Sequence, residues 1–208
     1  MRRRIDELVD IQLGYQFRER LTMASDGTHQ VIQVKDINQY ADHQLVPSSL
    51  YRVTPARDAE KYVVRNGDVL FLSKGRRNSA TLVEELRDDV PAIAAGYFFI
   101  LRPRTSNLRS DYLTWAINAP PAQAFLQSVA SGSAMPFVAR PAFESLEIDV
   151  PSVDRQGAIV ELHRLSRRER LLYDRLAELK SNLITELCVA AAKKRDKQTG
   201  RIHVEEAD

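Results

Sequence analysis

The chain has 208 residues, of which 44% are hydrophobic and 28% charged, and its formal net charge is +2. This size supports one domain with an appendage and excludes two ordinary domains. Cys188 is the single cysteine, so an internal disulfide is excluded, and its apolar helical surroundings favour packing over reactivity. The longest apolar run, residues 92–101, is about half of what a membrane span needs, and the charged N-terminus does not fit a secretory signal. We therefore expect a cytoplasmic protein without membrane association.

The first half of the chain predicts short strands separated by turns. Residues 5–17 predict a short helix or strand that enters a turn at Gly14. Asn66-Gly67 is a tight-turn signal between two apolar runs, which predicts a hairpin or a tight corner. Alternation or apolar composition predicts strands at residues 31–37, 62–64, 69–73 and 96–101, the last closed by Pro103.

The second half begins with helical periodicity. Ser110 can cap a helix that ends before Pro120, and the proline pair there suits the first turn of a second helix. Residues 131–133 end that helix, residues 136–141 are expected to form a loop, and residues 145–150 a last strand. The head is therefore predicted to be α+β, with a curled mixed sheet or small barrel and short helices.

Residues 153–192 predict one long helix. Ser152 is a suitable N-cap, and Asp154 lies at the positive end of the helix dipole. At 1.5 Å per residue the helix would be roughly 55 Å long, too long to lie flat on the head, so its leucine stripe needs a partner in a coiled coil. The stripe residues expected at this interface are Leu162, Leu165, Leu172, Leu176, Leu179 and Leu183. We thus expect a head at residues 1–150, a spacer helix at 151–192 and a polar, disordered tail at 193–208.

Positive charge is concentrated in two stretches of the head. Residues 61–80 hold Lys61, Arg65, Lys74, Arg76 and Arg77 against a single acidic residue, and residues 98–141 hold Arg102, Arg104, Arg109 and Arg140. Residues 84–89 form an acidic loop. This segregation can give a basic face that suits a polyanion, but from charge alone ordinary surface charge on loops is the better interpretation.

Taken in order, several segments resemble the specificity (S) subunit of type I restriction–modification systems. They are Leu8–Arg18, Val31–Ile37, Val64–Gly75, Tyr97–Arg102, Tyr112-Leu113, Phe125-Leu126, Ala130–Ala134, Leu146–Pro151 and Arg155–Ile159, which leads into the long helix. The resemblance implies a target recognition domain that reads one half of a bipartite DNA site. It also implies that the helix is a spacer that pairs antiparallel with a second helix and docks methyltransferase subunits.

The chain departs from the family in having one recognition domain and one spacer helix instead of two of each. This implies either a half-size subunit that dimerises or a truncated relative. The implied partners are double-stranded DNA, a second copy, methyltransferase subunits and the restriction subunit. The implied cofactor, S-adenosylmethionine, belongs to the methyltransferase subunit, and this chain itself is expected to be non-catalytic and to bind no metal.

Two loops and two single residues are the candidate DNA contacts. In the first loop, Lys74, Arg76, Arg77 and Asn78 offer a phosphate contact, an arginine fork for guanine and an amide for adenine. In the second, Ser131 and Ser133 offer small polar groups that can approach a phosphate. Arg140 and Lys35 are further candidates. The alternatives are a solvated loop for the first and a helix cap with a turn for the second.

Other readings of the sequence are weaker. Tyr97-Phe98-Phe99 and Trp115 could stack on bases, but their apolar neighbours favour core packing. No motif for nucleotide binding, zinc binding or catalysis is present in the sequence, which disfavours a stand-alone enzyme. The main rival is a coiled-coil interaction protein that binds methyltransferase subunits without reading DNA, as a decoy or regulator.

Overall fold

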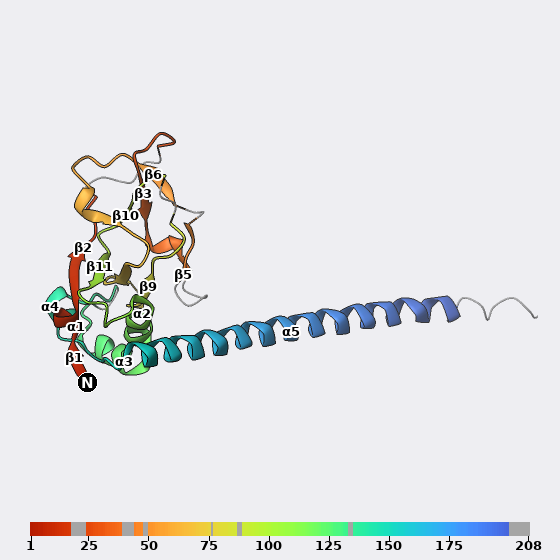
Figure 1. Cartoon of the computed structure of the whole chain (residues 1–208). Coiled ribbons are helices and arrows are strands. Elements are labelled where there is room, and N and C mark those ends of the chain that lie inside the picture. The colour runs from red at the N-terminus through yellow and green to blue at the C-terminus, as the bar shows by residue number, and fades with distance from the viewer. Residues whose placement is uncertain are drawn as a thin grey trace, which may run out of the picture. The chain divides into compact units, whose positions relative to one another are not determined.

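The computed structural model describes residues 1–17, 24–38, 44–47, 50–75, 77–86, 89–132 and 135–199, with residues 194–199 described by their backbone alone. The chain divides into two compact units, Met1–Val160 and Glu161–Asp208. We call the first unit the head. The long helix begins in the head and continues through the second unit (Figure 1).

The head is a mixed α+β structure. Its strands are β1 (Arg2–Arg4), β2 (Val9–Leu13), β3 (His29–Ile32), β4 (Ile37–Asn38), β5 (Gln44–Leu45), β6 (Tyr51–Val53), β7 (Val63–Val64), β8 (Val69–Leu72), β9 (Ala80–Leu82), β10 (Ala92–Ala94), β11 (Phe98–Pro103) and β12 (Glu147–Asp149). Its helices are α1 (Ile5–Leu8), α2 (Ser110–Asn118), α3 (Pro120–Val129), α4 (Arg140–Glu144) and the start of α5 (Val153–Thr199), with 3-10 turns η1 (Val34–Asp36) and η3 (Glu60–Tyr62).

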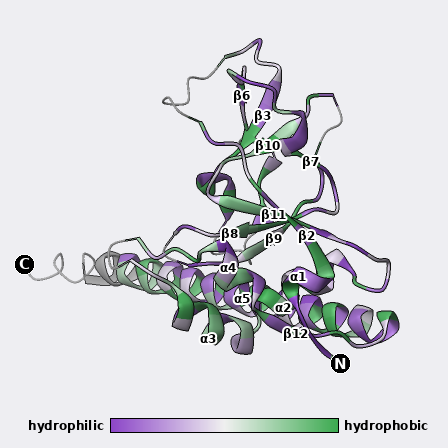
Figure 2. Cartoon of the chain, turned by 90° about the vertical axis from the view of Figure 1, so that its left-hand side faces the viewer, coloured by the Kyte–Doolittle hydropathy of each residue, from purple (hydrophilic) through white to green (hydrophobic). Residues whose placement is uncertain are grey.

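The strands form two four-stranded sheets and two small ribbons rather than one curled sheet. The sheet orders are β6-β3-β10-β7 and β2-β11-β8-β9, and the ribbons are β1-β12 and β4-β5. Between the described strands every pairing is antiparallel except that of β3 with β10. Both views place the second sheet between the first sheet and the short helices α1 to α4 (Figures 1 and 2).

This middle position explains why β8 and β11 are continuous apolar runs. Phe71 lies opposite Phe99 and Leu70 opposite Ile100. Because successive side chains of a strand point to opposite faces, the two phenylalanines contact Phe143 of α4 on one side, while Leu70 and Ile100 join the core of the other sheet. All of these side chains are buried, so neither face of the strands has room for polar residues at these positions, and the polar residue of β11, Arg102, comes after them.

The strand predicted at residues 31–37 was wrong in its extent. β3 ends at Ile32, and the chain turns through η1 before β4 begins. Asp36 is buried, its carboxylate accepts a hydrogen bond from the amide of Gln33 at 2.9 Å, and its own amide donates to the carbonyl of Gln33 at 3.1 Å. These local bonds compete with a strand ladder, which explains the break.

The structure decides between the two predicted forms of one turn and corrects the prediction for another segment. Gly67 has a φ of +94°, as a tight turn requires, but β7 and β8 on either side belong to different sheets. The Asn66-Gly67 signal therefore marks a corner and not a hairpin. Residues 136–141, expected to be a loop, contain the start of α4, where Pro141 occupies the first turn and its missing amide leaves no helical bond unmade.

The long helix α5 begins where the sequence predicts. The carbonyl of Ser152 accepts a hydrogen bond from the amide of Gln156 at 2.9 Å, so Ser152 occupies the N-cap position directly before the first helical residue, Val153. The helix continues beyond the predicted end at Ala192 to Thr199, and residues 200–208 lie outside the described residues. In the part of the chain that the structure describes, no helix is long and apolar enough to cross a membrane.

Candidate nucleic-acid interface

At the end of β8, residues 73–75 lie beside two segments that come about 60 residues later in the chain, 131–132 and 136–138. The amide of Val138 donates to the carbonyl of Ser73 at 2.8 Å, and the amide of Gly75 donates to Pro136 at 3.1 Å. Ser131 and Phe137 exchange both of their backbone hydrogen bonds, at 2.9 and 2.8 Å. We call this patch, residues 73–75, 131–132 and 136–138, the loop junction. It unites the two loops that the sequence analysis treated separately.

The loop junction places three side chains in a row. Lys74 and Ser131 are each the antiparallel bridge partner of Phe137, and directly opposed residues of antiparallel strands point to the same face. Val138, the next residue, is 1% exposed, whereas Phe137 is 38% exposed. The face that carries Lys74, Phe137 and Ser131 is therefore the solvent face, and the other face is core.

Gly132 makes the turn between these segments possible. Its φ is +93°, and a Cβ atom at this position would lie 3.0 Å from the carbonyl oxygen of Met135. A residue with a side chain would be strained in both respects. Met135 itself is 61% exposed. Ser133, a predicted contact, lies outside the described residues.

Asn78 is buried and holds the loop that follows β8. Its side chain is 8% exposed, and its Nδ2 donates to the carbonyls of Leu72 and Ser73, both at 3.0 Å. Its own carbonyl accepts a hydrogen bond from Gln123 at 3.0 Å. Because the side-chain amide nitrogen is used to hold the loop, it is not available to a base edge. Arg77 is exposed, and Arg76 lies outside the described residues.

A cavity of about 520 Å³ opens beside the loop junction. Asn118 at the end of α2 exchanges two 2.8 Å hydrogen bonds with the backbone of Ala80, and Gln123 donates to two carbonyls, so these polar side chains are already paired. The lining residues are Arg77, Asn78, Ser79, Asn118, Pro120, Gln123, Leu126, Gln127, Ala130 and Pro136. Arg77 is the one charged residue among them.

The second basic stretch of the sequence is neutralised within the head. Arg102 donates to both carboxylate oxygens of the buried Asp68 at 2.9 and 2.8 Å, and these hydrogen bonds raise the pKa of Arg102. The other arginines of this stretch also have acidic partners: Arg104 pairs with Asp10, Arg109 with Asp111 and Arg140 with Glu144. Hence these arginines do not form a free basic surface.

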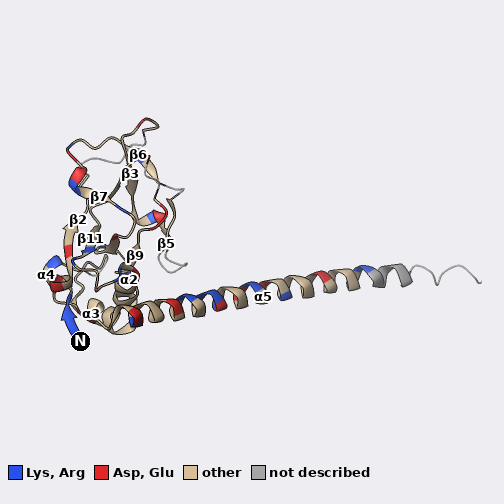
Figure 3. Cartoon of the chain, in the orientation of Figure 1, with Lys and Arg blue, Asp and Glu red and all other residues tan. Residues whose placement is uncertain are grey.

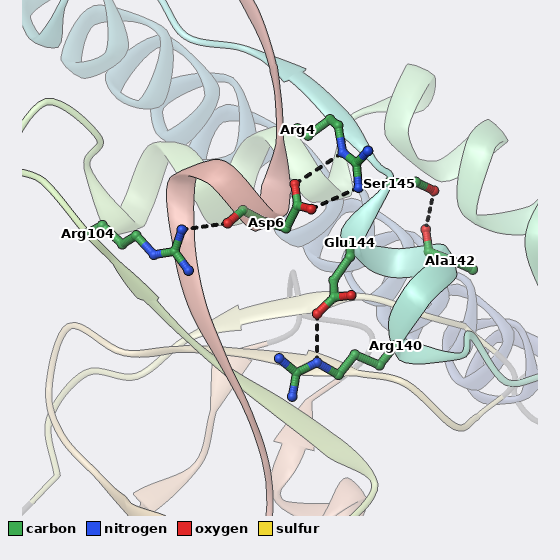
Figure 4. Close-up of polar contacts among 7 residues, drawn as sticks. All are labelled: Arg4, Asp6, Arg104, Arg140, Ala142, Glu144 and Ser145. Carbon is green, nitrogen blue, oxygen red and sulfur yellow. Dashed lines mark hydrogen bonds and ion pairs between the residues drawn. The ribbon is translucent and has the colours of Figure 1, made fainter.

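Figure 4 shows the same pattern on the side of the head formed by α1 and α4. Arg140 donates to Glu144 within its own helix at 2.7 Å. Arg4 donates to both oxygens of Asp6 at 3.1 and 2.8 Å, and Arg104 donates to the backbone carbonyl of Asp6 at 2.7 Å. By contrast, within the described residues Lys74 and Arg77 form no ion pair with a carboxylate.

Lys35 is the remaining predicted contact. It is exposed on η1, and its Nζ lies 3.0 Å from the ring centroid of Tyr51. The ring holds the ammonium group through its negative face. The side chain is thus oriented by an aromatic neighbour, and its contact with DNA stays a prediction.

Tyr97 corrects the expectation that all aromatic residues near β11 are core. Phe98 and Phe99 are buried as predicted, but Tyr97 is 50% exposed. It belongs to the turn before β11, where its carbonyl accepts hydrogen bonds from the amide and the hydroxyl of Ser73, both at 2.8 Å. The prediction failed because an apolar run does not reveal that a turn occupies its first residue.

The predicted leucine stripe of α5 is exposed along its whole length. The exposed fractions are 70% for Leu162, 54% for Leu165, 63% for Leu172, 47% for Leu176, 49% for Leu179 and 55% for Leu183. Acidic and basic residues are both spread along the described part of this helix (Figure 3). Because these leucines are exposed, they add little hydrophobic free energy to the stability of the helix within the described part of the chain.

The fold is similar to those of solved type I restriction–modification structures. An S subunit from M. genitalium matches with a TM-score of 0.53 and 14% identity, over 79% of this chain and 38% of that one. The HsdS subunit from Thermoanaerobacter tengcongensis matches with a TM-score of 0.58 and 17% identity, over 84% and 39%. A third structure, described as showing complex assembly and conformational transition of the type I R-M system, matches with a TM-score of 0.64 and 20% identity. The match covers 88% of this chain and 42% of that one.

These identities are low, so the likeness is one of fold. No family model matches the chain, and no curated protein matches its sequence. The chain spans between 38% and 42% of the length of the three solved structures.

Proposed function

We propose that this chain is a DNA-specificity subunit of a type I restriction–modification complex and that the loop junction contacts double-stranded DNA. The observation that carries the proposal is that Lys74 and Arg77 have no carboxylate partner among the described residues and lie beside a surface held by backbone hydrogen bonds. Cations without carboxylate partners attract phosphates at the lowest desolvation cost. A frame fixed by the backbone also keeps its side chains in register with a groove.

The exposed leucine stripe supports the second part of the proposal, a homodimer formed through α5. A coiled coil would bury the stripe and remove a large apolar surface from water. A second copy paired in this way would supply a second head and a second helix. A twofold dimer would read an inverted repeat, since the symmetry of the protein is repeated in its site.

In this proposal the partner subunits, and not this chain, carry out the chemical reactions. Methyltransferase subunits recruited by the α5 pair would bind S-adenosylmethionine, take the target adenine out of the base stack and methylate it. A restriction subunit would join the same complex. The role of this chain is to choose the site and to set the distance between its two halves.

The decisive experiment is the salt dependence of duplex binding. The double variant Lys74→Gln/Arg77→Gln removes these two cations, and we expect the slope of log K against log salt to fall in magnitude by about two. The matched control is Arg2→Gln/Arg3→Gln, which removes the same charge from residues already paired with Glu147 and Glu7. We expect this control to change the slope little.

Two outcomes would contradict the proposal. Equal effects of both double variants would show that the loop junction is not the contact surface. If the wild type binds no duplex but still binds methyltransferase subunits, the chain is the decoy or regulator that the sequence left open.

A further inference from the structure

Phe137 is an aromatic side chain whose exposure the fold enforces. It cannot turn inward, because its neighbour Val138 occupies the core face at 1% exposure and the backbone bonds to Ser131 and Lys74 fix the strand direction. A ring that stays 38% exposed between a cation and a hydroxyl gives up part of the free energy that full burial would provide. The arrangement therefore favours a ligand with an apolar group flanked by polar ones.

The dimensions of the row select one groove of DNA. Neighbouring strands lie about 4.8 Å apart, so the row from Lys74 through Phe137 to Ser131 is about 10 Å wide. The major groove, about 12 Å wide, admits it, whereas the minor groove, about 6 Å wide, does not. On the base edges of the major groove the exposed apolar group is the 5-methyl of thymine.

We propose that Phe137 packs against the 5-methyl group of a thymine in the recognised sequence, with Lys74 and Ser131 directed at the polar groups on either side. This inference rests on the proposed function and extends it by naming a base and the residue that reads it. Met135, exposed beside Gly132, lies at the edge of the same surface. The row therefore contributes specificity through an apolar contact as well as affinity through charge.

The test replaces thymine by deoxyuridine, which removes the methyl group and leaves base pairing intact. A selection from a random duplex library with the full chain first gives the preferred sequence. Each thymine of that sequence is then replaced in turn, and binding is measured for the wild type and for Phe137→Ala. At one thymine per half-site we expect a loss of about fourfold for the wild type, the worth of one buried methyl group, and no change for Phe137→Ala.

Two further variants separate reading from folding. Phe137→Leu keeps an apolar side chain and should retain a preference for thymine over uracil even if Phe137→Ala folds poorly. Val153→Ala is the matched control, because Val153 is also 38% exposed but lies at the start of α5; it should respond to deoxyuridine as the wild type does. A defined sequence in which no thymine responds, or one in which Phe137→Ala responds equally, overturns the inference alone. A selection that returns no sequence overturns the proposed function and the inference with it.

Discussion

Gln156 gives the sharpest test of how the head holds the start of α5. Its side chain is 0% exposed. Its Oε1 accepts a hydrogen bond from the amide of Arg109 at 3.0 Å, and its Nε2 donates to the carbonyls of Asn107 and Pro151, both at 2.8 Å. Each bond contributes about 1 kcal/mol net, so Gln156→Ala should lower the free energy of unfolding by about 2–4 kcal/mol, including the cavity it leaves.

The measurement is urea denaturation of the full chain at one fixed concentration. Gln127→Ala is the control, because this exposed glutamine of α3 should cost less than about 0.5 kcal/mol. Gln156→Glu sharpens the test, since its carboxylate would place an oxygen against the carbonyls of Asn107 and Pro151 and should cost at least as much as alanine. If Gln156→Glu is as stable as the wild type, the assigned hydrogen bonds are incorrect.

Three other predictions follow from exposed or ionised side chains. Leu176→Glu should weaken dimerisation more than about a hundredfold in analytical ultracentrifugation, because it puts a charge in the stripe, while Leu171→Glu, outside the stripe but 56% exposed, should not. Arg140→Gln should reduce duplex affinity less than Lys74→Gln/Arg77→Gln, because Arg140 already pairs with Glu144 of α4; equal losses of affinity would contradict the assigned DNA-binding surface. The hydrogen bonds from Arg109 lower the pKa of Asp111 below its ordinary 3.8. Its ionised form thus stabilises the fold above that pH and loses this effect as the pH falls through the folded value. The stability advantage of the wild type over Asp111→Asn should therefore shrink below about pH 4, and an advantage independent of pH would refute the assignment.

Elements with both a clear period and a clear end could be predicted from the sequence. α2, α3 and the start of α5 have apolar residues at helical spacing next to prolines that begin or end them. The apolar runs of β8 and β11 predict buried strands for the same reason. The predicted cap of α2 was wrong, because Ser110 is the first residue of the helix and Arg109 is the N-cap, without a side-chain hydrogen bond. The prediction failed at Asp36, where a side chain satisfies the backbone locally, because periodicity does not register such hydrogen bonds.

The candidate site could be predicted only in part, since its geometry depends on pairing between distant segments. Basic residues near 74–78 and small residues near 131 were visible as two loops. Their union through Phe137 was not, because nothing local in the sequence states that residue 137 is the neighbour of both. The count of charged residues also overstated the free positive charge of residues 98–141. The acidic partner of an arginine there can come from elsewhere in the sequence, as Asp68 does for Arg102.

The way in which the loop junction is built separates its shape from the side chains it presents. Its hydrogen bonds run between backbone atoms, and its turn depends on Gly132, whose φ of +93° no other residue adopts readily. The outward positions 74, 131 and 137 make no contribution to that frame beyond their backbones. Under the proposed function, substitutions there would change which bases are contacted while the inward residues, Ser73 and Val138, keep the fold. A surface that reads DNA sequence requires this division, because its specificity can then vary without loss of stability.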